Sequence, residues 1–133
     1  MSFADSGVRT VHEGHLPKVI TLAEAANPGD LLGYSSGWKL ADASTGVAIG
    51  ARLVALQKGA IGDEIGAVAI AKVDGFTGAT VGGKMYASET AGDYTQAEPT
   101  DVGDLVQCVG YAVSATEALV SLVIPNEAAV AGS

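Results

Sequence analysis

The sequence predicts an all-β fold, either a small β-sandwich or a β-barrel-like body. Turn signals recur at short intervals from Pro28 to Pro125, and short apolar runs separate them. Three of the turns contain Gly-Asp and lead into a short apolar run, at residues 29–32, 62–65 and 103–106. Glycine accepts a positive φ and aspartate hydrogen-bonds to its own backbone, so Gly-Asp is typical of a tight turn that leads into a strand. Such close spacing favours a sandwich or barrel over alternating strands and helices.

The first predicted strands lie on either side of a Gly-Asp turn. Residues 18–22 are rich in strand-forming side chains, and the next four residues either continue the strand or form one helical turn. Residues 31–34 and 38–41 are expected to form a hairpin, because the short loop between them contains Gly37.

Two longer apolar segments are predicted to be buried strands. Residues 47–56 contain Gly50, where a β-bulge is expected. Residues 64–73 are long enough for a helix, but their β-branched side chains and the lack of a charged face favour a strand. A turn at residues 74–75 is expected to end it. The remaining strands are predicted at residues 81–87, 94–96, 104–113 and 118–124.

The chain is expected to comprise one domain with two terminal segments. Residues 1–17 show little periodicity, so they are predicted to be an extended arm that lies outside the compact sheet and is ordered only by a partner. Residues 18–125 form the predicted β-rich body, and residues 126–133 are predicted to be a flexible tail. A chain of 133 residues is too short for a second domain with a core of its own.

The composition predicts a core of small aliphatic side chains and an apolar surface. The chain is 48% hydrophobic but only 5% aromatic, so Val, Ile, Leu and Ala must fill the core. Because charged residues make up only 17% of the chain, more apolar surface is expected to remain than a monomer usually exposes. We therefore expect a homo-oligomer or a docking partner; a monomer rich in Ala and Gly is the alternative.

The charge argues against two classes of partner. The net charge is −8, and the basic residues, Arg9 and Arg52 among them, are scattered singly as expected for solvated surface, so no nucleic-acid partner is predicted. No apolar run is long enough to span a membrane, so no membrane partner is expected. The N-terminus lacks a secretory pattern, so we expect the protein to be made in a cytosol. Cys108 is the only cysteine, which excludes an intramolecular disulfide, and it is predicted to be an inert strand residue.

The residues that carry chemistry in other proteins do not form a convincing site in this sequence. His12 and His15 lie three apart in the predicted arm, which offers at most three metal ligands and is more typical of solvated polar side chains. The carboxylates of residues 63–64, Asp101 and Asp104 lie in turns, where solvated aspartate is usual. No nucleophile elbow is predicted, and both histidines lie in the predicted arm. We therefore predict no catalytic, cofactor-binding or metal site, and no enzymatic activity.

Beyond these patterns, the chain resembles the capsid decoration proteins, or cement proteins, of tailed bacteriophages, in the group with serial Gly-Asp turns. The resemblance extends over residues 18–125. It is carried by turns and strands and not by catalytic motifs, and its segments are residues 28–33, 39–50, 59–69, 81–86 and 102–117.

The resemblance implies a structural, head-stabilising virion protein made in the host cytoplasm. Such a protein would bind the outer surface of an expanded icosahedral capsid, often as a homotrimer, and connect neighbouring major capsid proteins. The arm would then lie along a capsid subunit or the next copy, adding a strand to an exposed edge. The alternatives are a phage fibre or tail accessory module, or a small ligand- or carbohydrate-binding β domain with Tyr34, Trp38 and Tyr94 as an aromatic platform.

Overall fold

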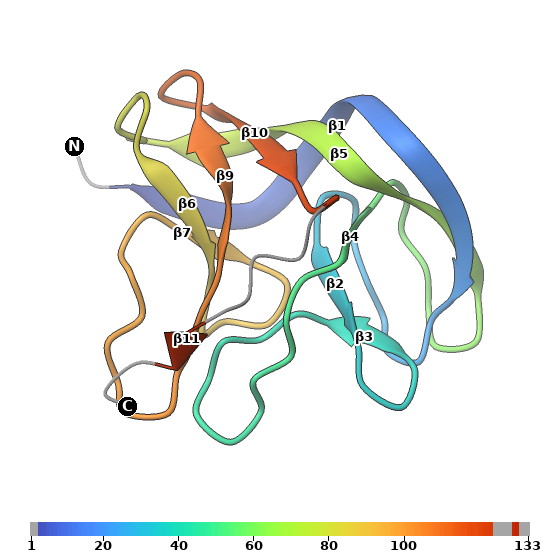
Figure 1. Cartoon of the computed structure of the whole chain (residues 1–133). Coiled ribbons are helices and arrows are strands. Elements are labelled where there is room, and N and C mark those ends of the chain that lie inside the picture. Colours follow the sequence, from blue (N-terminus) through green and yellow to red (C-terminus); the bar gives the residue numbers. More distant parts are fainter. Residues whose placement is uncertain (1–2, 124–128, 131–133) are drawn as a thin grey trace.

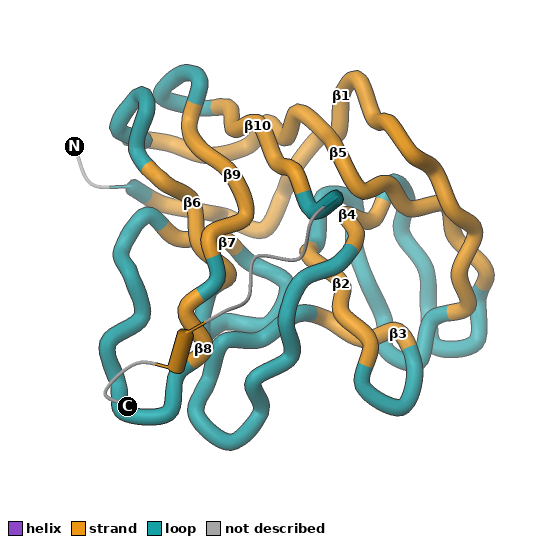
Figure 2. The backbone as a smooth tube through the Cα atoms, viewed as in Figure 1, coloured by secondary structure: helices purple, strands orange, loops and turns teal. Residues whose placement is uncertain are grey.

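A computed structural model describes residues 3–123 and 129–130, and this part of the chain consists of strands and loops without a helix (Figure 2). The strands are β1 (Ala4–Thr21), β2 (Leu31–Tyr34), β3 (Trp38–Leu40), β4 (Leu53–Ala55), β5 (Glu64–Thr77), β6 (Lys84–Ala87), β7 (Tyr94–Thr95), β8 (Leu105–Val106), β9 (Cys108–Ala112), β10 (Glu117–Ser121) and β11 (Ala129–Val130).

Nine of these strands form one antiparallel sheet that curls into a half-barrel (Figure 1). The order along the sheet is β3-β2-β4-β5-β10-β9-β6-β7, and β1 pairs with β5 outside this path. Strands β8 and β11 form a separate antiparallel pair. The prediction of an all-β fold with a barrel-like body is therefore confirmed, as is the β2–β3 hairpin.

Strand β5 is the centre of the sheet and pairs with three other strands. It pairs with β1 along its length, and with β4 and β10 over separate segments. The turn predicted at residues 74–75 is absent, because the strand continues to Thr77. Gly75 explains the difference: a Cβ on it would lie 2.3 Å from the Val8 carbonyl oxygen, so this glycine permits a close approach to β1 instead of reversing the chain.

The predicted arm is extended, but it does not lie outside the sheet. Residues 4–17 belong to β1, which runs beside β5 in a long arc (Figure 1). Two register shifts interrupt the pairing, and Gly7, Glu13 and Leu16 have positive φ. The strand therefore lacks the regular alternation from which sequence analysis recognises a strand.

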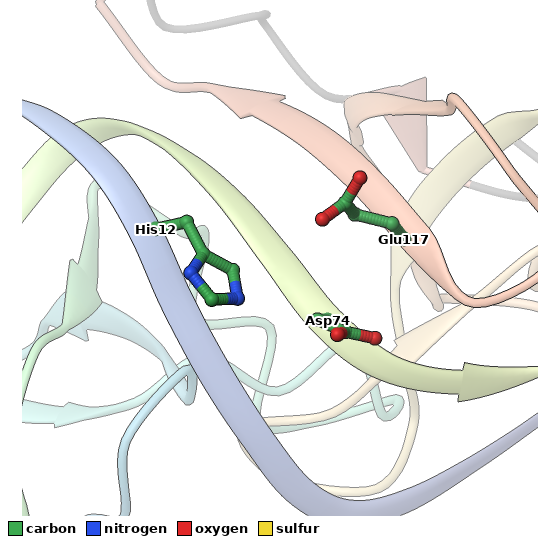
Figure 3. Close-up of side chains that lie close together, drawn as sticks. All are labelled: His12, Asp74 and Glu117. Carbon is green, nitrogen blue, oxygen red and sulfur yellow. The ribbon is translucent and has the colours of Figure 1, made fainter.

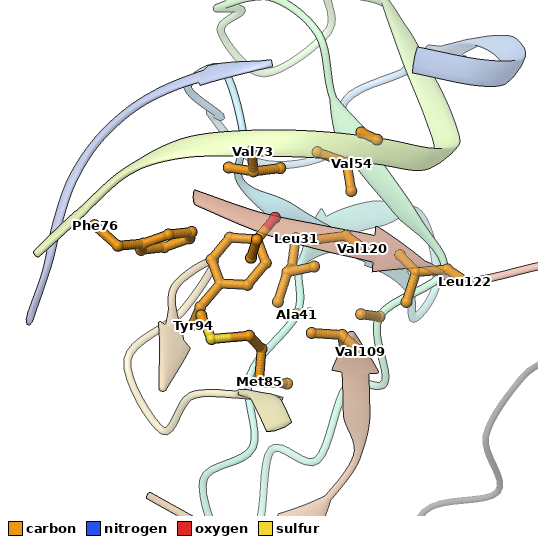
Figure 4. Close-up of a cluster of buried hydrophobic side chains, with 14 of the residues drawn as sticks. Leu31, Ala41, Val54, Val73, Phe76, Met85, Tyr94, Val109, Val120 and Leu122 are labelled. Atoms are coloured by element: carbon orange, nitrogen blue, oxygen red, sulfur yellow. The ribbon is translucent and has the colours of Figure 1, made fainter. Parts of the chain in front are cut away.

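The core has two parts because β2 and β4 are buried on both faces. The larger cluster fills the curl of the sheet, where Phe76 and Tyr94 are in edge contact with ring centroids 5.2 Å apart (Figure 4). Leu31 faces this cluster, whereas the adjacent Leu32 faces a smaller one that Trp38 partly covers. Small aliphatic side chains dominate both clusters, as the composition predicts: mainly alanine and valine in the larger one, and leucine, alanine and isoleucine in the smaller one.

The strand predicted over residues 47–56 is confined to β4, and a buried side chain explains why. Gln107 accepts a hydrogen bond from the Ala51 backbone N–H (2.7 Å) and donates one to the Ala51 carbonyl oxygen (3.0 Å). Its amide thus takes the place of a neighbouring strand. Of the predicted tail, 126–133, only residues 129–130 are described, and they form β11; the rest lies outside the described residues.

Six turns in the described part of the chain share one geometry. In each, the third residue is a glycine with φ between 80° and 93°, and the fourth N–H donates to the first carbonyl oxygen. These are features of a type II turn. The Gly-Asp turns predicted from the sequence are three of the six. The turns span residues 27–30, 44–47, 60–63, 80–83, 90–93 and 101–104.

A side chain also binds the first N–H of each turn. In the three Gly-Asp turns predicted from the sequence, the aspartate at the fourth position accepts this hydrogen bond. Gly83 stands at that position in the 80–83 turn, and Gln96 accepts the bond from Thr80 instead (2.8 Å). In the 90–93 turn the hydroxyl of Ser88 accepts it, which leaves Asp93 available for another contact.

Candidate functional site

A buried arginine joins the start of β1 to two of the turns. The Arg9 side chain is fully buried and forms ion pairs with Asp5 (Nη2 to Oδ2, 2.8 Å), Asp30 (Nη1 to Oδ1, 2.6 Å) and Asp93. Asp30 and Asp93 are the last residues of the 27–30 and 90–93 turns. The sequence-based interpretation of Arg9 as solvated surface is therefore wrong.

Tyr94 completes this group, which we call the Arg9 cluster: Asp5, Arg9, Asp30, Asp93 and Tyr94. The Arg9 Cζ atom lies 5.1 Å from the centroid of the Tyr94 ring. The Tyr94 hydroxyl donates to the Gly29 carbonyl oxygen (2.8 Å), and its backbone N–H donates to Asp5 (2.9 Å). The cluster thereby ties β1, β2 and β7 together and holds the curl of the sheet.

The electrostatics of the Arg9 cluster indicate a structural role. Burial acts to lower the pKa of Arg9, but Asp5 and the other acidic partners outweigh it and the pKa is raised. Burial raises the pKa of Asp30 and the pKa of Asp93, against the opposing effect of Arg9. A hollow of about 310 Å³ lies beside the cluster and is lined by Gly7, Val8, Arg9, Asn27 and Pro28. Every guanidinium nitrogen of Arg9 already contacts a carboxylate, so the hollow offers little charge to a ligand.

An acidic cluster lies among the loops that precede β7 and β8. Carboxylate oxygens of Glu89, Asp101 and Asp104 lie within 4.8 Å of one another. Asp104 is buried and accepts hydrogen bonds from the Thr45 N–H (3.0 Å) and hydroxyl (2.8 Å). A hydrogen bond with Asp104 raises the pKa of Glu89 to about 7. Asp104 thus supports a loop contact, whereas residues 63–64, the other acidic pair singled out from the sequence, are exposed.

A second cluster brings His12 of β1, Asp74 of β5 and Glu117 of β10 together on one face of the sheet (Figure 3). One potential ligand atom from each lies within 4.8 Å of the other two. Asp74 and Glu117 are directly opposite each other in the ladder, and His12 is opposite Lys72, two residues from Asp74. We call this group the His12 cluster.

The histidine pair considered from the sequence does not form the site. His15 is opposite Ile70 and is not part of the group, and Glu13 forms an ion pair with Lys72 (3.1 Å). Sequence analysis missed Asp74 and Glu117 because they are 43 positions apart and only the register of β5 and β10 places them together. The sequence predicts a turn at Asp74 and a loop at Glu117, and acidic residues are too common in turns and loops to reveal a site.

The aromatic platform considered from the sequence is not assembled. Tyr34 and Trp38 are in edge contact in the β2–β3 hairpin, with ring centroids 5.4 Å apart. Tyr94, however, is buried in the larger core and belongs to the Arg9 cluster. An aromatic pair remains, and Tyr34 is its exposed member.

Large apolar side chains are exposed at the tips of three of the six turns. Ile61, Val81 and Val102 each occupy the second position of a turn and are 70%, 65% and 76% exposed. Their side chains are not needed for the hydrogen bonds that define the turns. The three turns lie at separate corners of the molecule (Figure 1). We call these three residues the turn tips.

Strand β1 presents further apolar side chains at an edge of the sheet. Val8, Leu16 and Val19 are exposed. In the described part of the chain, β5 is the only strand that pairs with β1, so the other edge of β1 is open to a partner.

The described residues include no helix that could cross a membrane. Comparison with protein-family models, with curated proteins and with solved structures finds no match for this chain.

Proposed function

We propose that this chain is a structural virion protein that binds the outer surface of a tailed-phage capsid and connects neighbouring major capsid proteins. The observation that carries the proposal is the placement of exposed apolar side chains at separate corners of one small body. A protein that binds one small ligand concentrates its apolar contacts in one concave site. Contacts at several corners suit a protein that touches several neighbours at once.

The turns support this interpretation because the side chains at their tips are not needed for the hydrogen bonds that form the turns. In these turns the hydrogen bonds come from the backbone, from the aspartate at the fourth position or from Gln96. None comes from the second side chain, so an apolar residue there is available for contact. A single exposed valine or isoleucine contributes little binding free energy. Repetition over many copies on a symmetric shell makes weak contacts effective through multivalency.

The open edge of β1 supports association as well. A second chain can add a strand to an unpaired edge, and the exposed Val8, Leu16 and Val19 supply apolar contact beside it. The net charge of −8 keeps the free protein soluble and disfavours contacts with nucleic acid. We expect a homo-oligomer, with a trimer favoured.

The test is binding of the purified protein to undecorated, expanded phage heads. The triple variant Ile61→Ser, Val81→Ser, Val102→Ser removes the turn tips. The control is the double variant Lys58→Ser, Thr100→Ser, which changes exposed polar residues in two of these three loops. We expect saturable binding by the wild type and the control, and at least tenfold weaker binding by the triple variant. Sedimentation measures bound copies, cryo-microscopy locates them, and light scattering gives the mass of the free protein.

Two results would contradict the proposal. Absence of saturable binding to heads would exclude a capsid role and direct attention to tail or fibre assemblies. Equal binding by the triple variant and the control, with both variants folded, would show that the turn tips are not the contact surface.

A further inference from the structure

We propose that the His12 cluster is a zinc-binding site, in which His12, Asp74 and Glu117 each provide one ligand. The inference is independent of the proposed capsid role, because it rests on three side chains on the face of the sheet and not on the turn tips. Figure 3 shows the imidazole and the two carboxylates reaching from three adjacent strands towards a shared space.

The distances suit a metal ion after small side-chain rotations. The three potential ligand atoms lie within 4.8 Å of one another. Ligands bound to tetrahedral zinc at about 2.0–2.2 Å are separated by about 3.3–3.6 Å. His12 is exposed and the two acidic side chains are half-buried, so rotation about their side-chain bonds can close this difference without moving the backbone.

The backbone of the site is already fixed. Val11 and His12 pair regularly with Val73 and Lys72 of β5, and Glu117 pairs with Asp74 on the other side of that strand. The ligands therefore come from a continuous three-stranded ladder. A site built on paired strands holds its geometry better than one on mobile loops.

The charges of the cluster are only partly balanced: Lys72 interacts electrostatically with Glu117, but its ion-pair partner is Glu13. Asp74 and Glu117 are directly opposite each other, an arrangement in which two negative charges repel. None of the three side chains forms a hydrogen bond or an ion pair with another described residue, and the nearby Lys72 is held by Glu13 at 3.1 Å. A divalent cation between the carboxylates would relieve this repulsion.

The donor set selects the class of metal. An imidazole nitrogen with two carboxylate oxygens suits zinc and related transition metals, whereas magnesium and calcium favour oxygen ligands alone. Three protein ligands leave one tetrahedral position for water or for a ligand from another molecule.

The experiment is calorimetric titration of the whole protein with zinc chloride, together with its thermal unfolding with and without zinc. We expect one zinc ion per chain and an increase in Tm that EDTA reverses. The variants His12→Asn and Glu117→Gln are each expected to weaken zinc binding by at least about tenfold, since a ligand is lost. Calcium chloride in place of zinc is expected to give no saturable heat.

His15→Asn is the matched control, since it removes the neighbouring histidine on the same strand. We expect this variant to bind zinc as the wild type does. Circular dichroism in the absence of metal establishes that each variant is folded. The proposal is wrong if the wild type shows no saturable zinc binding, or if the His12 and His15 variants lose affinity equally.

Discussion

Arg9 and His12 are three residues apart on β1, and each meets carboxylates from other parts of the chain with a different outcome. Arg9 is buried and forms ion pairs with three aspartates. His12 is exposed, and neither it nor Asp74 and Glu117 has an ion-pair partner among the described residues. The comparison shows that the buried charges stabilise the fold, whereas the more exposed charges remain available to a ligand.

The largest effect is expected at Arg9. Replacing it by Met keeps an unbranched stem but removes the guanidinium, which leaves three carboxylates close together without a cation. We expect the free energy of unfolding to fall by about 3–5 kcal/mol. In the absence of metal, His12→Asn should change the free energy of unfolding by less than about 0.5 kcal/mol. Urea unfolding of both variants measures the two values.

Arg9→Lys refines this result. Lysine keeps the charge but lacks the planar fork that contacts several carboxylates, so an intermediate loss is expected. Equal stability of the Arg9→Met variant and the wild type would show that the Arg9 cluster does not hold the sheet.

A smaller effect is expected from a glycine packed against Arg9. Gly29 and Gly62 occupy the same position in two turns, with φ of 83° and 90°. A Cβ on Gly29 would lie 2.7 Å from the Cβ of Arg9, whereas a Cβ on Gly62 would meet nothing within 4 Å. Both Ala variants carry the cost of positive φ. We expect Gly29→Ala to lose about 1–3 kcal/mol more than Gly62→Ala in urea unfolding; equal losses would indicate that Arg9 moves freely.

The smallest effect is expected in the pH dependence of the Arg9 cluster. Burial raises the pKa of Asp93 in the folded state above its unfolded value of about 3.9. As the pH falls through the folded pKa towards 3.9, the native state binds the proton first, so folding gains stability. The wild type should therefore gain stability relative to Asp93→Asn over this interval. Urea unfolding at a series of pH values measures the difference, and a relative loss on acidification would contradict the direction of this shift.

Sequence analysis predicted the parts of this fold that depend on local chemistry. The Gly-Asp turns are readable because glycine at the third position and aspartate at the fourth each have a local reason to be there. The β2–β3 hairpin is readable for the same reason. The 80–83 and 90–93 turns are harder to recognise from the sequence. In them Gln96 and Ser88, and not an aspartate at the fourth position, accept the hydrogen bond from the first N–H.

The features that were missed depend on contacts between distant residues. Arg9 resembles any surface arginine until Asp30 and Asp93 are brought to it across 21 and 84 positions. Strand β1 was hidden because positive φ at Glu13 and Leu16 interrupts its alternation. The His12 cluster needed the register of three strands, which a single sequence does not specify.

The irregular backbone of β1 has a consequence for the protein at high concentration. A long straight edge strand is a template on which copies stack without limit. The positive φ values of Gly7, Glu13 and Leu16 divide this edge into short segments with different directions. Another chain can pair with one segment, but a continuous ribbon cannot extend along all of them. The same open edge is thereby compatible with a closed assembly of few copies and unsuited to fibril growth.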